Sequence, residues 1–437
     1  MSLGAPLDPG VEVVIEKLIP DGVALGRLDD GRVVMLNGAA PGDRVMLEEF
    51  SEKKGLIKAQ RWALVLASRE RVQPRCPVAS ECGGCDWMML SEAEQSRSKL
   101  SLLQQALRRT AKIAEYTYAP LWSGERRHGY RSRVRMQLVA GRIGFRRRSS
   151  HDIVEPAQCA VSEPALNDAL ARLRQLVQKY PGALDAFSEV ELAADSQGGV
   201  ALHFDRAEQA SPSAATHSLV AELTAQFQVS LGEVESGEPP FQRFELVDGV
   251  YLLAPVGTFT QVNWEVNRAM IRELLSGVQQ RGIESFLDLY AGAGNFSLPL
   301  LAKGLKGVSV EAVRASAHAA REAARRQGLN GGRFWGRDAR RAVEALEREQ
   351  RRFDLVIIDP PRAGVKHGLV EMAALSSGWI ALCSCNPVTL ARDLRTLLDE
   401  GYELEAMQPF DMFPQTHHLE TLAWLRVPPS ARPLATP

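Results

Sequence analysis

The sequence predicts a multidomain α/β protein with an N-terminal OB-like β-barrel, a central α+β domain and a C-terminal doubly wound parallel sheet. Three patterns support this fold class. An N-terminal segment alternates short apolar and polar runs, a middle segment mixes strand-like and helical runs, and from Glu265 helical stretches alternate with apolar strands. We expect three domains, over residues 1–68, 69–260 and 261–437. The chain of 437 residues, 45% hydrophobic, is long enough for a core in each.

Composition excludes several classes of protein. The formal charge of −1 and a pI near 6.7 give no global sign of a polyanionic partner, so any nucleic-acid surface has to be a local cluster. No apolar run approaches the length of a membrane span, and the start MSLGAPLDPGVEV lacks the pattern of a signal peptide. We therefore expect a cytoplasmic, monomeric protein without membrane contact. Six cysteines are too few for a disulfide scaffold of this size, so clustered thiols indicate metal binding or catalysis.

The first 68 residues predict a small antiparallel barrel. The runs VEVVIEKL, RVVMLNG, DRVMLEEF and GLIKAQRWALVL are separated by Asp-Gly and Pro-Gly turn signals. Further on, Ser91 with Glu94 three residues later is typical of a capping box at the start of an amphipathic helix. At the other end of the chain, the proline-rich residues 428–437 show no periodicity and predict a loose tail.

Between the barrel and that helix lies a cysteine cluster. Cys76, Cys82 and Cys85 form the pattern C-x5-C-x2-C, and Cys159 offers a fourth thiolate after the chain returns. Four thiolates suit either structural zinc or an iron–sulfur cluster. A zinc ribbon generally pairs two short C-x-x-C hooks, whereas this chain has one triplet and a distant single cysteine, which favours a [4Fe-4S] cluster. The alternative is a set of buried cysteines without a ligand.

A basic segment within the central domain predicts an RNA surface. It contains nine arginines and no acidic residue, namely Arg126, Arg127, Arg131, Arg133, Arg135, Arg142, Arg146, Arg147 and Arg148. Tyr130 and Phe145 are interleaved with them, and such clusters bind phosphates and stack on unpaired bases. A solvated, charged hairpin is the alternative, but arginines without compensating carboxylates repel one another. Further along, the polar stretch over residues 206–218 predicts a surface loop.

The stretch SFLDLYAGAGNFSLPLA predicts a ligand-binding turn between a strand and a helix. Its Gly-Ala-Gly turn lets the backbone approach a ligand, but Ser297 occupies the third glycine position of the dinucleotide fingerprint. Asp288 precedes the turn, where an acidic group favours a cationic sulfonium cofactor over a pyrophosphate. Glu311 ends the next strand, at the position of an acceptor for two ribose hydroxyls. The plain alternative for Glu311 is a solvated carboxylate at a strand end.

Two further carboxylates follow strands of the same predicted sheet. Asp338 in GRDA and Asp359 in IIDPPR end the next two strands, so a row of acidic groups lines the carboxyl edge. Ligands of open α/β sheets bind along that edge.

The stretch WIALCSCNP places a thiol at the same edge. Cys385 is followed by Asn-Pro and a helix, and a thiol near a helix N-terminus is biased toward the reactive thiolate. Cys383, two residues earlier in the apolar run, is expected to pack as a small hydrophobe. Glu420 in the C-terminal strand is the candidate general base, with His417 and His418 as nearby alternatives.

With these motifs, the chain closely resembles the bacterial RNA 5-methyluridine methyltransferases, and most closely the iron–sulfur enzymes that act on large-subunit ribosomal RNA. The resemblance implies a TRAM barrel, a [4Fe-4S] cluster on the four cysteines, and a Rossmann-like class I methyltransferase domain. It also implies a set of residues that bind S-adenosylmethionine, namely Gln261 in GTFTQVN, Tyr290 and Asn295 in DLYAGAGN, Glu311, Asp338 and Asp359. Asp359 is further expected to touch the target uracil, and SCNP and MFPQTHHLE carry the family nucleophile and base at Cys385 and Glu420.

The expected function is therefore methyl transfer from S-adenosylmethionine to C5 of a uridine in RNA through an adduct of Cys385 with C6, and the resemblance favours 23S rRNA as the target. RNA cytosine-5 methyltransferases resemble this pattern but carry a cysteine after the proline of the fourth-strand motif, where this chain has DPPR. Two alternatives stay open: methylation of uridine 54 in tRNA, and an RNA-binding ribosome-assembly factor whose catalysis is secondary.

Overall fold

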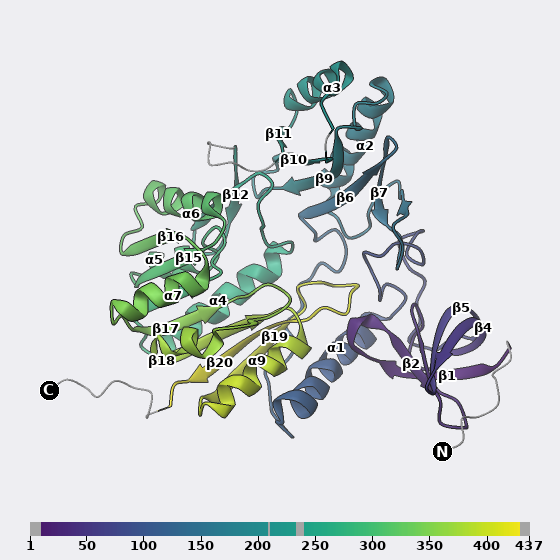
Figure 1. The fold of residues 1–437 in the computed structure, drawn as a ribbon, viewed down its shortest axis with the longest axis horizontal. Helices are drawn as coiled ribbons and strands as arrows, with labels where there is room; N and C mark the ends of the chain where they lie inside the picture. The colour runs from purple at the N-terminus through teal and green to yellow at the C-terminus, as the bar shows by residue number, and fades with distance from the viewer. Residues whose placement is uncertain (1–9, 209, 233–239, 429–437) are drawn as a thin grey trace.

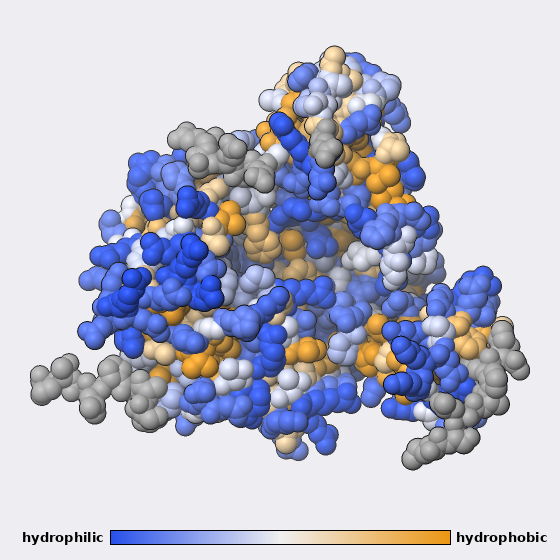
Figure 2. Space-filling model, in the orientation of Figure 1, coloured by the Kyte–Doolittle hydropathy of each residue, from blue (hydrophilic) through white to orange (hydrophobic). Residues whose placement is uncertain are grey.

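The computed structural model describes residues 10–208, 210–232 and 240–428, which form a small barrel, a central sheet and a large C-terminal sheet (Figure 1). The surface in Figure 2 is hollowed between the lobe of the central sheet and the C-terminal sheet. Nearly all of the predicted tail over residues 428–437 lies outside the described residues. Within the described ranges, no helix is both long enough and apolar enough to cross a membrane.

The predicted N-terminal barrel is confirmed. Its strands close in the order β1-β2-β3-β5-β4 and are β1 (Glu12–Leu18), β2 (Ala24–Arg27), β3 (Val33–Leu36), β4 (Arg44–Lys53) and β5 (Leu56–Leu66). Alternate side chains of β1, such as Val13 and Ile15, point into the barrel core, as the period of two in a strand requires. The prediction of a purely antiparallel barrel was wrong, because β3 and β5 pair in parallel to close it. A short turn, η1 (Pro20–Gly22), joins β1 to β2.

The helix predicted after the cysteine cluster begins where the capping residue placed it. In α1 (Glu92–Ala106) the Ser91 hydroxyl accepts a hydrogen bond from the Glu94 backbone N–H at 3.1 Å. The helix continues into the π-turn η2 (Leu107–Ala111), and its apolar side chains join the core beneath α9 (Pro387–Asp399) of the C-terminal sheet. The helix α1 thus packs on both sides, since Leu103 joins the core of the C-terminal sheet and Leu102 joins the barrel core.

The central domain is built on a six-stranded sheet. Its order is β11-β10-β9-β6-β7-β8, and its strands are β6 (Arg133–Val139), β7 (Arg142–Arg146), β8 (Ile153–Val154), β9 (Phe187–Ala194), β10 (Val200–Arg206) and β11 (Gln228–Leu231). Two helices accompany it, α2 (Pro164–Lys179) and α3 (Ala214–Thr224). The loop predicted over residues 206–218 was partly wrong, because a capping box of Ser213 and Thr216 starts α3 within it.

A hairpin separates the central sheet from the C-terminal one. Its strands β12 (Phe241–Glu245) and β13 (Tyr251–Pro255) share a hydrophobic core with α4 (Trp264–Gln280) and α6 (Arg314–Arg326). The hydrophobic core therefore extends the C-terminal domain to the N-terminal side of the predicted boundary at residues 260 and 261.

The C-terminal domain is the predicted doubly wound sheet, of order β16-β15-β14-β17-β18-β20-β19. The strands are β14 (Ser285–Leu289), β15 (Lys306–Glu311), β16 (Gly332–Gly336), β17 (Phe353–Ile358), β18 (Ser376–Ser384), β19 (Glu403–Phe410) and β20 (Glu420–Arg426). The remaining helices are α5 (Ser297–Ala302), α7 (Ala339–Arg348) and α8 (Leu369–Ala374). Only β20 runs against its neighbours, and one hydrophobic core covers each face. The strand order reverses between β14 and β17, which is where open α/β sheets bind ligands.

Candidate active site

The glycine turn after β14 lies at this switch point, as the sequence predicted. Tyr290, Gly292 and Gly294 have φ angles of 63°, 56° and 90°, in the left-handed region that favours glycine. A Cβ atom on Gly294 would lie 2.9 Å from the Leu298 side chain, so the turn packs directly on the helix behind it. The turn therefore presents bare backbone at the edge of the sheet.

Glu311 lies beside that turn. Its carboxylate accepts hydrogen bonds from the backbone N–H groups of Gly292 at 2.9 Å and Val313 at 2.7 Å. Each carboxylate oxygen keeps a further lone pair, so the group remains able to accept from two hydroxyls. The two backbone contacts thus fix the orientation of the Glu311 carboxylate at the edge of the sheet.

Asp288 is fully buried beneath the turn. The Ser297 hydroxyl donates to its Oδ2 at 2.5 Å, whereas Oδ1 has no hydrogen-bond partner among the described residues. Burial raises the pKa of this carboxyl to about 7. A bound cation near the turn would favour the ionised form.

The other predicted cofactor residues lie on several segments of the domain. Asn295 exchanges two hydrogen bonds with Asn267 of α4, at 2.7 and 2.9 Å, and Gln261 lies in the loop just before α4. Asp338 is exposed and caps α7 by accepting from the Arg340 backbone N–H at 3.0 Å. Asp338 therefore has a helix-capping role whether or not it also contacts a cofactor.

Cys385 occupies the corner between β18 and α9. Asn386 caps the helix by accepting from the Val388 backbone N–H at 2.9 Å, and Pro387 stands in the first turn. The neighbouring Cys383 is fully buried in the hydrophobic core, as expected. Cys385 instead borders open cavities, so it is the thiol that a substrate can reach.

The expected bias of Cys385 toward the thiolate was wrong for this structure. Burial, together with the nearby carboxyls of Glu420 and Asp359, raises the pKa of the thiol to about 12, although the Arg362 guanidinium acts in the opposite direction. Two nearby acidic groups and desolvation outweigh the partial charge of one helix end. In the free protein the nucleophile is therefore held as a thiol that needs a base.

Glu420 and Asp359 form an acidic pair beside Cys385, in which Glu420 is buried and Asp359 is half-buried. Glu420 is 5% exposed at the start of β20, which pairs with β18 beside Ser384, and its Oε1 has no hydrogen-bond partner among the described residues. Burial and the neighbouring Asp359 raise the pKa of Glu420 well above its usual range. Burial likewise raises the pKa of Asp359 to about 7. Carboxyls whose pKa is raised in this way bind protons more readily than exposed ones, which suits general acid–base work.

The cavity beside Cys385 has a volume of about 610 Å³ and is bordered by segments far apart in the sequence. We call η1 the barrel turn and residues 76–86 the cysteine loop. The cavity lining includes Asp21 of the barrel turn, Asp86 of the cysteine loop, Arg131, Arg148, Arg362 and His417. A second cavity of about 270 Å³ joins Cys385 to the same barrel turn. Cys385 thus faces a polar cleft with room for a nucleotide.

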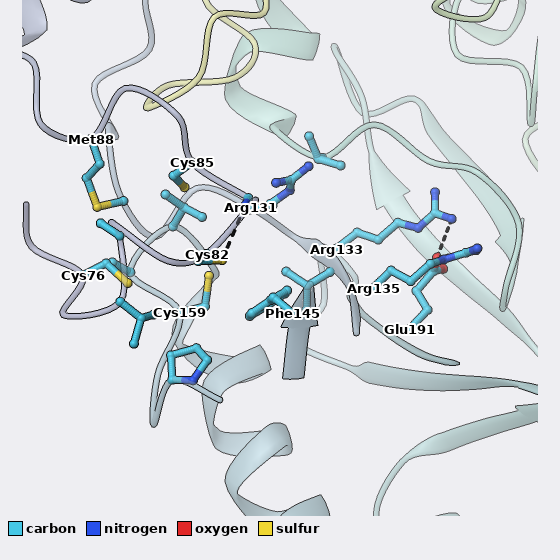
Figure 3. A pocket seen from close by; sticks show the side chains of 18 residues that line it. Cys76, Cys82, Cys85, Met88, Arg131, Arg133, Arg135, Phe145, Cys159 and Glu191 are labelled. Carbon is cyan, nitrogen blue, oxygen red and sulfur yellow. Dashed lines mark hydrogen bonds and ion pairs between the residues drawn. The ribbon is translucent and has the colours of Figure 1, made fainter. Parts of the chain in front are cut away.

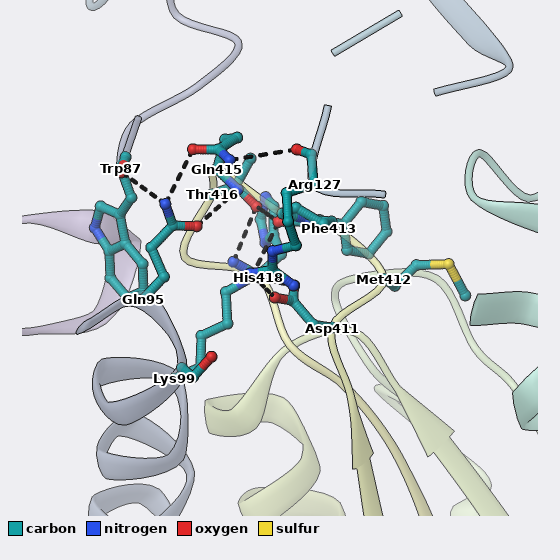
Figure 4. A network of polar contacts seen from close by, with 12 residues as sticks. Trp87, Gln95, Lys99, Arg127, Asp411, Met412, Phe413, Gln415, Thr416 and His418 are labelled. Atoms are coloured by element: carbon teal, nitrogen blue, oxygen red, sulfur yellow. Dashed lines mark hydrogen bonds and ion pairs between the residues drawn. The ribbon is translucent and has the colours of Figure 1, made fainter. Parts of the chain in front are cut away.

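The loop between β19 and β20, which leads to Glu420, is held by a buried polar network (Figure 4). Asp411 accepts from Lys99 of α1 at 2.5 Å and lies 2.6 Å from Arg127, and Lys99 and Asp411 are fully buried. The Gln95 side-chain amide donates to the Gln415 side-chain oxygen at 3.0 Å. These contacts connect the loop that precedes Glu420 to α1, which lies more than 300 residues earlier in the chain.

The four predicted cluster cysteines all line one cavity of about 360 Å³ (Figure 3). The cysteine loop is held by Arg148, whose guanidinium donates to the Cys85 carbonyl at 3.0 Å. Asn167 of α2 holds the backbone N–H of Cys159 at 2.8 Å. Burial raises the pKa of Cys85 to about 12, so a cationic ligand is needed to keep it as a thiolate. Among the described residues, no group of three or more His, Cys, Asp or Glu is placed to hold a metal ion.

The arginine segment contains no acidic residue, but it has carboxylate partners from other parts of the chain. The prediction that its arginines are uncompensated was therefore wrong. Five of its nine members meet acidic partners from other segments: Arg127 with Asp411, Arg133 and Arg135 with Glu191, Arg142 with Glu155, and Arg147 with Glu81. Tyr130 is buried and donates to the Pro414 carbonyl at 3.0 Å, so it cannot stack on a base. Arg131 and Arg148 line the Cys385 cavity and are the members placed toward a substrate.

Two functional candidates escaped the sequence argument. Phe259 is 65% exposed two residues before Gln261, and Arg133 lies over its ring at 5.6 Å. Arg362 follows Asp359 in the DPPR motif, and its guanidinium is the positive charge that favours the Cys385 thiolate. The DPPR motif could have identified Arg362 from the sequence. No sequence pattern indicates that the side chain of Phe259 is exposed, which only the fold shows.

Comparisons with known proteins cover almost the whole chain. Residues 250–427 match the family described as tRNA (Uracil-5-)-methyltransferase. The 23S rRNA (uracil(1939)-C(5))-methyltransferase RlmD of Aeromonas hydrophila is 33% identical over 427 residues, which cover 94% of this chain and 95% of the relative. An uncharacterized RNA methyltransferase of Bdellovibrio bacteriovorus is 31% identical over 95% of each chain. The Pyrococcus abyssi tRNA (uracil-54, C5)-methyltransferase, solved with S-adenosyl-L-homocysteine, shares the fold with a TM-score of 0.73 at 24% identity, over 95% of this chain and 99% of that one.

Proposed function

Since the chain belongs to the family of RNA uracil-5 methyltransferases, we propose that it methylates C5 of one uridine in 23S rRNA through a covalent bond between Cys385 and C6. The observation that carries the chemistry is the position of Cys385, which borders an open cleft with the acidic pair of Glu420 and Asp359 behind it. Relatives named for 23S rRNA match 94% of the chain at 33% identity, which favours this RNA over tRNA. The position named in those relatives, uracil 1939, is the first site to examine.

S-adenosylmethionine supplies the methyl group on a positively charged sulfur. The residues that we propose to hold it are Gln261, Tyr290, Asn295, Glu311, Asp338 and Asp359. The glycine turn, the fixed Glu311 carboxylate and the unpartnered Oδ1 of Asp288 support this fit, because they offer bare backbone, a hydroxyl acceptor and buried negative charge at one edge.

The cysteine makes uracil reactive at C5. After the thiol proton passes to the neighbouring Asp359 carboxylate, the Cys385 sulfur bonds to C6, and the electrons of the C5=C6 double bond move into an enolate with negative charge on C5. C5 then attacks the methyl group, so that the new C–C bond forms as the donor's S–C bond breaks. Glu420 removes the C5 proton, and those electrons restore C5=C6 and expel the Cys385 thiolate. Burial of Glu420 strengthens it as a base, since its raised pKa increases the affinity of its carboxylate for a proton.

The acidic pair predicts the pH dependence of the reaction. Below the pKa of about 7 for Asp359, and below the raised pKa of Glu420, these carboxyls are protonated and cannot accept a proton. We therefore expect kcat/KM to rise by about tenfold from pH 6 to pH 8 in single-turnover methylation assays. Glu420→Gln should accumulate the protein–RNA adduct on gels, because C5 loses no proton. A flat pH profile, or a Glu420→Gln enzyme that turns over normally, would assign the base elsewhere.

For the cysteine cavity we propose a [4Fe-4S] cluster held by Cys76, Cys82, Cys85 and Cys159. The shared cavity of about 360 Å³ supports a bulky ligand, because a single zinc ion needs sulfur atoms within about 2.3 Å of itself. Anaerobically purified protein should be brown and contain about four irons per chain, measured by iron and sulfide assay. Stoichiometric zinc without iron would overturn the assignment.

The RNA target is tested by deleting the gene and mapping 5-methyluridine. Loss of one methyl group in 23S rRNA, restored by the wild-type chain, is the expected result. Loss at uridine 54 of tRNA would establish the tRNA alternative, with which the solved relative shares the fold. A Cys385→Ala chain that corrects a ribosome-assembly defect without restoring methylation would favour the assembly-factor alternative.

A further inference from the structure

We propose that Asp86 and His417 form a positioning pair for Arg362, which keeps one guanidinium beside Cys385. The inference rests on the proposed function, because it assigns Arg362 the task of stabilising the nucleophilic thiolate. It gives a role in the methyl-transfer site to the cysteine loop, from which Asp86 comes, and to the barrel turn that packs on it.

The contacts define one chain of hydrogen bonds. His417 Nδ1 lies 2.5 Å from Asp86 Oδ2, and its Nε2 lies 3.3 Å from an amino nitrogen of Arg362. A guanidinium only donates, so Nε2 accepts from Arg362 while the Nδ1–H donates to Asp86. His417 and Asp86 are largely buried, with side-chain exposures of 17% and 14%. These two contacts therefore fix the orientation of the imidazole.

Apart from His417, the described residues offer the Arg362 guanidinium one ion-pair partner, Asp21. The two groups are 3.8 Å apart, and their side chains are 53% and 81% exposed. A loose, solvated ion pair of that kind restrains a long side chain weakly. The imidazole is thus the rigid partner that determines where the guanidinium lies.

The position of Arg362 matters because of what else faces Cys385. Glu420 and Asp359 both disfavour the thiolate, and Arg362 favours it. His418 contributes no charge, because burial and the nearby His417 lower its pKa to about 3. Displacing the guanidinium would leave the thiolate facing acidic groups alone.

Three segments meet at the pair. Asp86 directly follows Cys85, and His417 belongs to the loop that leads to Glu420. Gly22 of the barrel turn packs against both, since a Cβ there would lie 1.9 Å from Asp86 Oδ2 and 3.1 Å from His417 Nδ1. Trp87 Nε1 donates to the Gly22 carbonyl at 3.2 Å. The barrel therefore reaches the catalytic centre through a close backbone contact.

The test measures the thiol directly, without RNA. The rate at which iodoacetamide alkylates Cys385 is followed by peptide mass spectrometry from pH 6 to 10 in the full-length, anaerobically purified protein. His417→Ala is expected to slow alkylation at pH 8 by about tenfold, and kcat by a similar factor, with RNA affinity changed less than about twofold. His417→Gln should recover most of both rates, because its amide donates to Asp86 and its carbonyl accepts from Arg362.

Two comparisons separate positioning from a structural effect. In an Arg362→Ala background, His417→Ala should have no further effect on alkylation, whereas additive losses would overturn the proposal. Gly22→Ala should reproduce the loss by displacing Asp86. Gly31→Ala, at another barrel glycine with positive φ and open space around it, should not. The positioning proposal would also be overturned if His417→Ala left the alkylation rate unchanged. It would likewise be overturned if the His417→Ala protein lost its iron together with its activity. A separate experiment tests the proposed function itself: methylation of RNA by the Cys385→Ala protein would contradict it.

Discussion

Cys385→Ala is expected to lower methyl transfer by about 10⁴-fold or more, because no other group can form the bond to C6 that activates C5. The substitution removes the thiol that borders the cleft and leaves the surrounding helix cap unchanged. Transfer of labelled methyl groups to RNA measures the loss. The variant should also form no covalent adduct with RNA containing 5-fluorouridine, which traps the wild-type enzyme because C5 carries no removable proton.

The matched control is Cys383→Ala, two residues earlier on β18. Cys383 is fully buried in the core, so its substitution should cost about 1 kcal/mol of stability and leave the adduct intact. If Cys385→Ala still formed the adduct, or if a folded Cys383→Ala protein lost it, Cys383 would be the nucleophile in place of Cys385.

Asp411→Ala is expected to destabilise the fold by about 3–5 kcal/mol. The change leaves Lys99 and Arg127 as buried cations with no carboxylate between them. Burial already lowers the pKa of Lys99, so its charge depends on this partner. The cost should be visible as a lower thermal midpoint and a lower midpoint of urea unfolding, and part of the protein is expected to be insoluble.

An exposed ion pair provides the comparison for that effect. Asp399 pairs with Arg395 one turn earlier on α9, and its side chain is 62% exposed. Asp399→Ala should cost no more than about 0.5 kcal/mol, since water screens and replaces such contacts. Equal effects of the two substitutions would mean that the buried network contributes no more than a surface pair.

The local sequence determined the elements that depend on neighbouring residues. The alternation in the barrel strands, the Ser91 cap, the glycine turn and the corner at Cys385 all follow from backbone preferences and side-chain periodicity within a few residues. The order of apolar strands and helices likewise predicted the doubly wound sheet. Motifs within these elements carried the resemblance to a known family, which the comparisons confirmed.

The tertiary structure decided what surrounds those elements. The carboxylates that pair with the arginine segment come from other parts of the chain, so the absence of acidic residues within it was misleading. The raised pKa of Cys385 reflects its burial and then the carboxyls of Glu420 and Asp359, which β20 and β17 bring to its corner. Asp86 and His417 are 331 residues apart, and Gly22 packs against both. Sequence patterns record local conformation, whereas charge, burial and hydrogen-bond partners depend on which distant segments the fold brings into contact.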